Sequence, residues 1–96
     1  MEILKQKSDF EEIIKEGPVL IDFYADWCGP CKMLSSVLET MEINVVKVNT
    51  DKHQELAKIY GVMSIPTVYI YKDGKKVEKF IGFKSKEEIN NIINNL

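Results

Sequence analysis

The segment VLIDFYADWCGPCKM, residues 19–33, joins the pattern of a buried strand to both cysteines of this 96-residue chain. Its first part, through Ala25, is apolar on both faces except at Asp22, and this predicts a central strand covered by helices on both sides. Cys28 and Cys31 follow where the next helix is expected to begin. A cysteine pair at this spacing is part of a metal site, a structural disulfide or a reversible redox pair, and the neighbouring residues must separate these alternatives.

The composition is that of an ordinary globular protein. Hydrophobic residues make up 45% of the chain, charged residues make up 29%, and the formal net charge is -2. A charge this small gives no electrostatic case for binding nucleic acid or an anionic membrane. The length predicts one domain, residues 1–96, with a single modest core.

The N-terminal sequence MEILKQKSDFEEIIKEG does not have the apolar segment and small-residue cleavage site of a secretory signal. No apolar run approaches the ~20 residues that span a bilayer. The cytoplasm is therefore the expected location. In that reducing compartment a cysteine pair serves catalysis or metal binding more often than permanent crosslinking.

Apolar periodicity predicts helices after Ser8, beside the cysteines, after Asp51 and from Ser85. Glu11 and Glu88 would complete capping boxes with Ser8 and Ser85. The expected apolar stripes are Phe10, Ile13 and Ile14; Met33, Leu34, Val37, Leu38 and Met41; Leu56, Ile59 and Tyr60; and Ile89, Ile92, Ile93 and Leu96.

Strands are expected between these helices at residues 19–25, 45–48, 67–71 and 76–81, with a short edge strand near residues 2–4. Alternating strands and helices imply parallel pairs with right-handed crossovers, and the closing hairpin adds an antiparallel edge. The predicted fold class is therefore α/β.

The start of the second helix distinguishes the two cysteines chemically. Unpaired N–H groups and the partial positive charge of a helix N-terminus favour the thiolate form of Cys28. Cys31, one turn deeper, is expected to be more buried and to stay a thiol. Gly29 permits the close approach of another backbone, and Pro30 fits the first helical turn. This asymmetry is typical of an attacking and a resolving cysteine, and it favours a redox pair.

The other interpretations of the pair are weaker. A structural disulfide across so short a loop would contribute only about 2 kcal/mol. Zinc needs four ligands, which Cys28, Cys31 and His53 cannot supply within one chain, so that a metal would have to bridge two chains. His53 is expected to face solvent, and Lys32 after Cys31 excludes the haem-attachment pattern.

Four more residues have roles that the residues alone leave open. Asp22 is either a buried carboxyl with a raised pKa, suited to proton exchange with a thiol, or a residue at an accessible sheet edge. Lys47 either reaches that carboxylate or extends into water, which is the favoured reading. Trp27 belongs either to the core or to an exposed contact surface. Pro66 opens a strand, where a trans bond is the default and a cis bond the alternative.

The segments VLIDFYADWCGPCKM, VVKVNTDKHQELAKIYGVMSIPTVYIYKDGK and FIGFKS resemble the thioredoxin family across essentially the whole chain. The resemblance implies the thioredoxin fold, a central mixed sheet of four to five strands with helices on both faces. It also implies a protein disulfide reductase without a bound cofactor, acting on disulfide-containing target proteins. Thioredoxin reductase or another reductant would recharge it, and we expect a monomer.

At the matching positions, Cys28 corresponds to the attacking cysteine and Cys31 to the resolving one. Asp22 corresponds to the family's buried carboxylate, Lys47 to its neighbour, and Pro66 to a cis-proline facing the disulfide. The residues expected to hold substrate peptides are Trp27, Gly29, Pro30, Ile65, Pro66 and Gly82.

The chain departs from the family pattern at two internal positions and at its start. Tyr24 stands where many members have tryptophan, Ser36 stands where many have proline, and the shorter N-terminus leaves the first strand in doubt. Two rival functions remain: a glutaredoxin-like or oxidising dithiol protein, and a binding subunit of a larger enzyme. The Gly29-Pro30 dipeptide resembles reducing thioredoxins rather than the Pro-Tyr type common in glutaredoxins.

Overall fold

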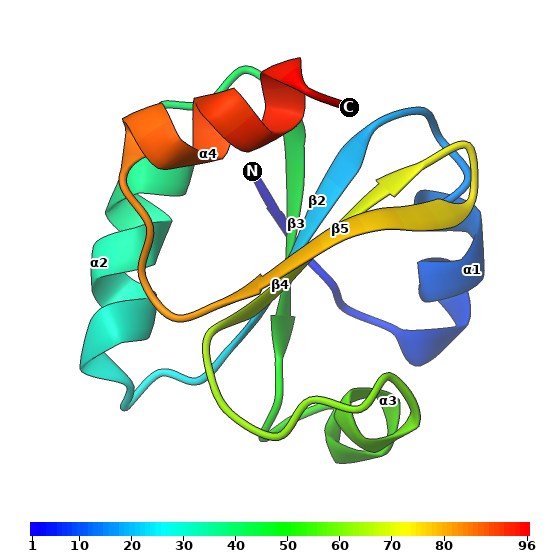
Figure 1. The fold of residues 1–96 in the computed structure, drawn as a ribbon. Coiled ribbons are helices and arrows are strands. Elements are labelled where there is room, and N and C mark those ends of the chain that lie inside the picture. Colours follow the sequence, from blue (N-terminus) through cyan, green and yellow to red (C-terminus); the bar gives the residue numbers. More distant parts are fainter.

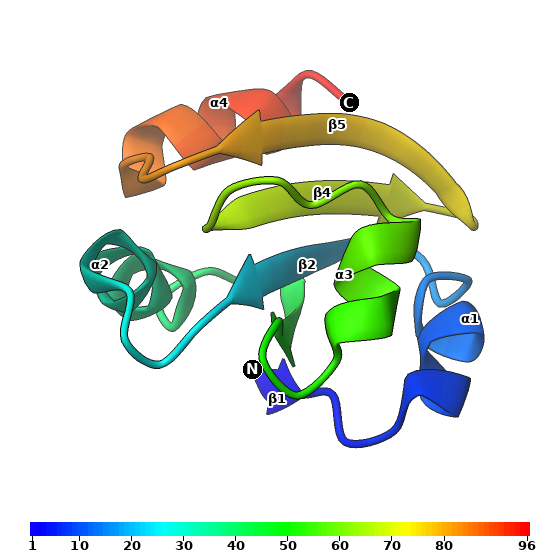
Figure 2. The ribbon, with the colours of Figure 1, turned by 90° about the horizontal axis from the view of Figure 1, so that it is seen from below.

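The computed structural model describes residues 1–96 and places a five-stranded mixed sheet between two layers of helices (Figures 1 and 2). The strands are β1 (Glu2–Ile3), β2 (Val19–Tyr24), β3 (Asn44–Asn49), β4 (Thr67–Lys72) and β5 (Lys75–Ile81). The helices are α1 (Phe10–Ile13), preceded by a 3-10 turn at Lys7–Asp9, α2 (Gly29–Leu38), α3 (Gln54–Ile59) and α4 (Lys86–Asn94). The predicted element order is confirmed, including the doubtful first strand.

The strand order is β1-β3-β2-β4-β5, with β2 at the centre. β3 runs parallel to β1 and β2, whereas β4 runs antiparallel to both β2 and β5. The predicted combination of parallel pairs and an antiparallel hairpin is therefore confirmed, and the hairpin joins the sheet directly beside the central strand. In this register Asp22 lies opposite Lys47 on β3 and Val68 on β4.

The expectation of a single core is wrong, because the sheet separates two cores and alternate side chains of β2 enter each of them. Phe23 packs with residues of α1 and α3, such as Phe10 and Leu56, whereas Leu20 packs with residues of α2 and α4, such as Leu34 and Ile89. Figure 1 shows the two helix pairs on opposite sides of the strands. Because side chains alternate along a strand, Asp22 shares the face of Leu20, the one that α2 covers.

The two expected capping boxes have different outcomes. Ser85 caps α4 as predicted: its hydroxyl accepts a hydrogen bond from the Glu88 N–H at 3.2 Å, and the Glu88 carboxylate accepts one from the Ser85 N–H at 3.0 Å. The box at Ser8 is wrong, because the chain there forms a 3-10 turn and α1 begins at Phe10 without a side-chain cap. Phe10 is buried against aromatic rings of the sheet, so tertiary packing sets the start of this short helix.

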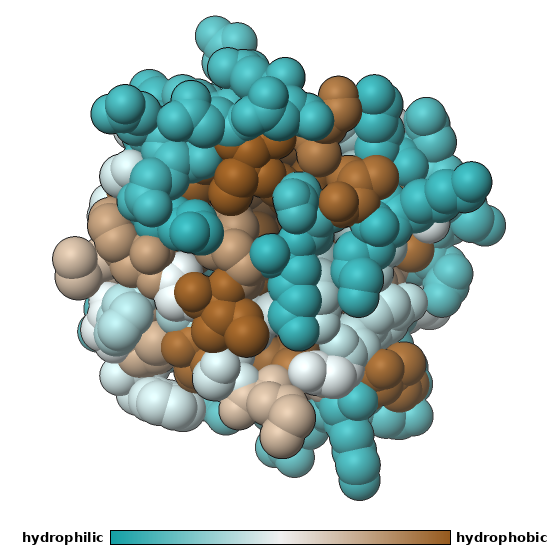
Figure 3. Space-filling model, in the orientation of Figure 1, coloured by the Kyte–Doolittle hydropathy of each residue, from teal (hydrophilic) through white to brown (hydrophobic).

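Three residues assigned to apolar stripes are exposed instead. Met33 is 58% exposed, Ile59 is 61% exposed and Leu96 is 42% exposed. Met33 and Ile59 belong to helices that turn only a narrow stripe to the sheet, such as Leu34 and Leu38 in α2, whereas Leu96 lies beyond the end of α4. Figure 3 shows that apolar side chains on one face of the molecule lie in separate patches between hydrophilic ones.

His53 does not simply face solvent as expected. It is half-buried at the start of α3, and its Nε2 lies 3.2 Å from the Leu4 carbonyl oxygen. The ring therefore ties α3 to the N-terminal segment. None of the helices has the length and the apolar character that crossing a membrane would require.

Candidate redox-active site

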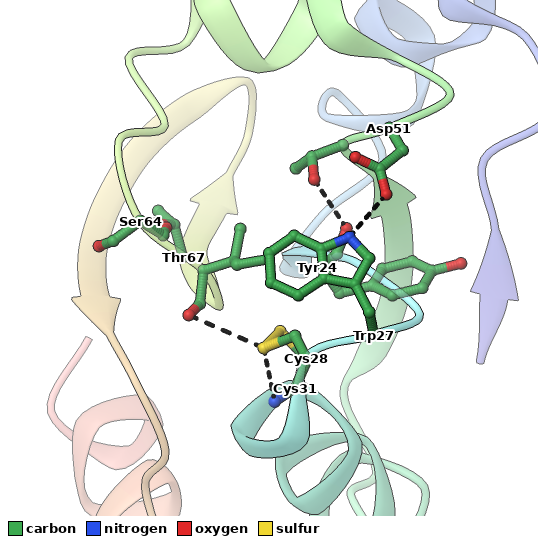
Figure 4. Close-up of a disulfide and its surroundings, with 9 residues drawn as sticks. Tyr24, Trp27, Cys28, Cys31, Asp51, Ser64 and Thr67 are labelled. Atoms are coloured by element: carbon green, nitrogen blue, oxygen red, sulfur yellow. Dashed lines mark hydrogen bonds between the residues drawn. A yellow bond between two sulfur atoms is a disulfide. The ribbon is translucent and has the colours of Figure 1, made fainter.

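Cys28 and Cys31 form a disulfide at the start of α2 (Figure 4). Their Cα atoms are 5.2 Å apart, within the usual range for a disulfide. Cys28 is the N-cap residue, with an extended backbone, and its Sγ accepts a hydrogen bond from the Cys31 N–H at 3.2 Å. The Cys28 sulfur thus occupies the place of a capping oxygen. An N–H group aimed at it and the positive end of the helix both favour negative charge on this atom.

Both cysteines are buried, and the difference between them is smaller than expected. Cys28 is 5% exposed and Cys31 is 2% exposed. They pack with Tyr24 and Ala25, and the half-buried Ile65 covers this small cluster. The predicted order of burial is confirmed, but the distinction between the sulfurs rests mainly on their positions along the helix rather than on exposure.

The segment before β4 lies against the disulfide. The Ile65-Pro66 bond is cis, as the resemblance implied, and the Ile65 carbonyl oxygen lies 3.9 Å from the Cys28 Sγ. The Pro66 carbonyl accepts a hydrogen bond from the Gly82 N–H at 2.8 Å. The Thr67 hydroxyl donates to the Ser64 carbonyl in the same segment (Figure 4). The fold therefore brings Ile65 beside the Cys28 sulfur and joins Pro66, the next residue, to Gly82.

Trp27 belongs to the surface rather than the core. It is 72% exposed, and its Nε1–H donates a hydrogen bond to the Asp51 carboxylate at 2.9 Å (Figure 4). Asn49 orders the loop that carries Asp51, because its Oδ1 accepts hydrogen bonds from the Asp51 and Lys52 N–H groups. In the sequence Asp51 marks only the start of a helix, and no local pattern indicates that its side chain reaches Trp27.

Asp22 is buried and not at an accessible edge. Its exposure is 0%, and neither carboxylate oxygen has a hydrogen-bond partner. Burial raises the pKa of Asp22 from 3.8 to about 7, because removal from water disfavours the charged form, and the positive charge of Lys47 offsets part of this effect. Asp22 can therefore exchange a proton near neutral pH.

Lys47 neither reaches the Asp22 carboxylate nor simply extends into water, the two alternatives that the sequence left open. Its ammonium donates a hydrogen bond to the Ser35 hydroxyl at 2.9 Å and lies 4.1 Å from the centroid of the Tyr24 ring. It forms no ion pair with Asp22 within 4.0 Å. A cleft of about 190 Å³ lies beside these groups and is lined by Tyr24, Ala25, Asp26, Cys31, Lys32, Ser35, Ser36 and Lys47.

No group of three or more His, Cys, Asp or Glu side chains is placed to hold a metal ion. A disulfide at a helix N-terminus, with a backbone N–H aimed at the sulfur of its first cysteine, is instead the arrangement for exchanging thiols and disulfides. The class that this site and fold define is the thiol–disulfide oxidoreductases. The thioredoxin family model matches residues 2–95, and the chain belongs to the thioredoxin family.

Curated relatives support the same assignment. A thioredoxin from Chlamydia caviae is 50% identical over 91 residues, covering 90% of this chain and 89% of that protein. A thioredoxin from Bacillus subtilis is 47% identical over 91 residues, covering 88% of each. The chain is accordingly a thiol–disulfide oxidoreductase with thioredoxin function.

Solved thioredoxin structures share the fold. Oxidised mitochondrial thioredoxin 3 from Saccharomyces cerevisiae superimposes with a TM-score of 0.88 at 32% identity, over 100% of this chain and 95% of that one. A mutant thioredoxin from Halobacterium salinarum gives a TM-score of 0.87 at 34% identity, over 97% of this chain and 87% of that one.

Proposed function

We propose that this chain reduces disulfides in target proteins, with Cys28 as the attacking cysteine and Cys31 as the resolving one. The observation that carries this assignment is the hydrogen bond from the Cys31 N–H to the Cys28 sulfur at the helix N-terminus. That position favours a thiolate on Cys28, and the thiolate is the form that attacks a disulfide.

The reaction takes place in two exchanges. The Cys28 thiolate attacks one sulfur of the target disulfide; the target S–S bond breaks, a mixed disulfide forms, and one target thiolate leaves. The Cys31 sulfur, having lost its proton, then attacks the Cys28 sulfur, and the second target thiolate leaves. The target gains two electrons, and this chain is left with the Cys28–Cys31 disulfide.

Asp22 is the proposed acceptor of the Cys31 proton. It lies on the sheet face that α2 covers, and a pKa of about 7 leaves a large fraction of it ionised near neutral pH. Lys47 is the proposed charge beside it, since it is the one positive group that moves the pKa of Asp22. Cys31 and Lys47 line the same cleft, which brings the Cys31 thiol near the charge that acts on Asp22.

The proposed substrate surface surrounds the disulfide. Trp27 presents an exposed aromatic face, and the Ile65 backbone offers polar groups to an extended peptide beside the Cys28 sulfur. The full proposed set is Trp27, Gly29, Pro30, Ile65, Pro66 and Gly82. Gly29 leaves open space on the helix end, with nothing within 4 Å of where a Cβ would lie.

Disulfide-containing proteins are the substrates, and thioredoxin reductase or another reductant recharges the pair. We place the activity in a monomer, in one domain of residues 1–96, and in the reducing cytoplasm, where the dithiol form is maintained.

Trapping of intermediates tests the cysteine roles. Cys31→Ser should attack a protein disulfide and then accumulate a mixed disulfide on Cys28, because nothing resolves it. Cys28→Ser should neither turn over nor form adducts. Non-reducing electrophoresis with mass spectrometry of the adducts distinguishes the two variants, and the parent with thioredoxin reductase and NADPH is the positive control.

Two outcomes would contradict the proposal. Adducts on Cys31 in Cys28→Ser would mean that the roles are reversed. Normal turnover of Cys31→Ser, dependent on glutathione, would replace the dithiol route with the monothiol route of a glutaredoxin-like protein.

A further inference from the structure

Ser35 is a polar side chain of α2 that the reaction as described does not use. It lies four residues after Cys31, on the same helix face, and both residues line the cleft. Its hydroxyl accepts a hydrogen bond from the Lys47 ammonium at 2.9 Å, across from α2 to β3. The Tyr24 ring, at the end of β2, lies 4.1 Å from the same ammonium. Lys47 is thus held from two sides.

The position of Lys47 requires an explanation because the Asp22 carboxyl, which would attract its ammonium more strongly than a hydroxyl does, is near. Lys47 lies opposite Asp22 in the β2–β3 register and on the same face of the sheet. Asp22 is a buried carboxyl whose two oxygens have no partner, and such groups are usually paired. The ammonium nevertheless contacts Ser35 and Tyr24 and forms no ion pair with Asp22.

We infer that Ser35 is a positioning residue, whose hydroxyl holds the Lys47 ammonium beside Cys31 and out of direct contact with Asp22. This inference rests on the proposed roles of Asp22 and Lys47. An ammonium in direct contact would favour the ionised carboxylate and make it a weaker base toward the Cys31 thiol. Held at a distance, the same charge stabilises Asp22 only moderately, and the carboxylate remains free to take a proton.

The other groups around Asp22 leave Lys47 as the charge that can change its titration. Asp26 and Lys32 also line the cleft, but both are exposed to solvent, which screens them. The remaining titratable neighbours are the Tyr24 phenol and the Cys31 thiol. On the other sides, β4 presents Val68 opposite Asp22, and α4 contributes Ile89 to this layer; both are apolar.

The test measures the pKa of Asp22 in the reduced protein. The 13C chemical shift of its carboxyl carbon, recorded as a function of pH, reports the titration. Ser35→Ala should lower the pKa of Asp22 by about one unit, because an opposite charge in contact lowers a carboxyl pKa by ~1–3 units. Ser35→Thr keeps the hydroxyl, so the pKa of Asp22 in this variant should equal that in the parent. Ser36→Ala is the matched control, since the Ser36 hydroxyl bonds only to the Lys32 carbonyl of its own helix.

A double-variant cycle separates the effect of Lys47 from a general disturbance of α2. In a Lys47→Met background, Ser35→Ala should leave the Asp22 titration unchanged, because no ammonium remains to be released. An unchanged titration in Ser35→Ala alone would overturn the inference. An equal shift of the Asp22 pKa in Ser36→Ala would also overturn it, as would the same shift on adding Ser35→Ala to the Lys47→Met background.

The rate of the resolving step distinguishes a failure of this inference about Ser35 from a failure of the proposed role of Asp22. The pH profile of mixed-disulfide resolution in Ser35→Ala should move to lower pH together with the Asp22 titration. If the titration moves and the profile does not, the proposed role of Asp22 as proton acceptor is wrong, while the placement of Lys47 by Ser35 stands.

Discussion

At the scale of the residue, Asp22 connects chemistry to stability. It is fully buried without a hydrogen-bond partner, and burial raises its pKa from 3.8 to about 7. A carboxyl whose pKa is higher in the folded than in the unfolded protein lowers the free energy of unfolding at any pH where the unfolded chain has ionised it. The cost is therefore absent below about pH 3, grows as the pH rises toward 7 and is constant above it. Its full size is on the order of 4 kcal/mol.

Replacing this carboxyl should stabilise the protein at neutral and higher pH. Asp22→Ala is expected to raise the free energy of unfolding by about 3 kcal/mol at pH 8, after allowance for a small cavity, and to leave no gain at pH 3. Urea denaturation at the two pH values measures this, and Asp26→Ala, an exposed neighbour, is the control. A less stable Asp22→Ala at pH 8 would mean that the carboxylate is well solvated in the fold. The same variant should slow the resolving step.

The contact between Trp27 and Asp51 gives a second prediction at this scale. Asp51→Ala removes the hydrogen bond that holds the exposed indole, which is worth about 0.5–1.5 kcal/mol. We expect kcat/KM for a protein disulfide to fall by roughly 2–10-fold, mainly through KM.

Two measurements check this prediction. Reduction of a small aromatic disulfide, which does not need the indole surface, should remain at the parent rate. Trp27 is the only tryptophan, so its fluorescence reports its release directly. An equal loss on both substrates would argue that Asp51 acts on the cysteines and not on the docking surface.

At the scale of the element, the helix starts differ in what fixes them. α4 carries its own start signal, because Ser85 and Glu88 satisfy each other's backbone N–H groups. α1 has four residues and no side-chain cap, and the burial of Phe10 defines where it begins. α2 is capped by the sulfur of Cys28, so the start of this helix and the redox site are the same feature.

The two serines of the expected capping boxes should therefore respond differently to substitution. Ser85→Ala should lower the free energy of unfolding by about 1 kcal/mol, the usual cost of losing an N-cap. Ser8→Ala should change it by less than about 0.5 kcal/mol, because Ser8 is an exposed residue of the 3-10 turn. Chemical denaturation of both variants makes the comparison, and an equal loss in Ser8→Ala would mean that it caps α1 in solution.

At the scale of the whole molecule, the site lies where one end of the sheet meets the helix layers. Cys28 follows the end of β2, the Ile65 segment precedes β4, and Asp51 follows the end of β3. The three neighbouring strands in the middle of the sheet thus deliver the sulfurs, the cis peptide bond and the indole's partner to one edge. Figure 2 shows α2 starting beside this edge.

The redox state should change the stability of the whole molecule. The disulfide closes a loop with a sequence separation of 3, for which loss of unfolded-chain entropy corresponds to about 2 kcal/mol. We expect the oxidised protein to be more stable than the reduced one by this amount, or by roughly 10 °C in Tm. Calorimetry of both forms measures it, and the Cys28→Ser/Cys31→Ser double variant should match the reduced form under either condition.

The sequence by itself determined the order of the elements, the central position of β2, the place of the cysteine pair at a helix start and the cap of α4. These features depend on residues that are near one another along the chain. The apolar run from Val19 predicts a buried strand, and the Ser85–Glu88 spacing predicts a cap, whatever the rest of the molecule does. The thioredoxin resemblance added the cis bond at Pro66 and the expected roles of the site residues.

Only the tertiary structure decided how the polar side chains meet. It buried Asp22, turned Lys47 to Ser35 and Tyr24, and held Trp27 at the surface through Asp51. The physical reason is sequence separation: the partners are 12 residues apart for Lys47 and Ser35 and 24 apart for Trp27 and Asp51. Each side chain has several partners within its reach, and the packing of α2 and the loop after β3 against the sheet selects one of them.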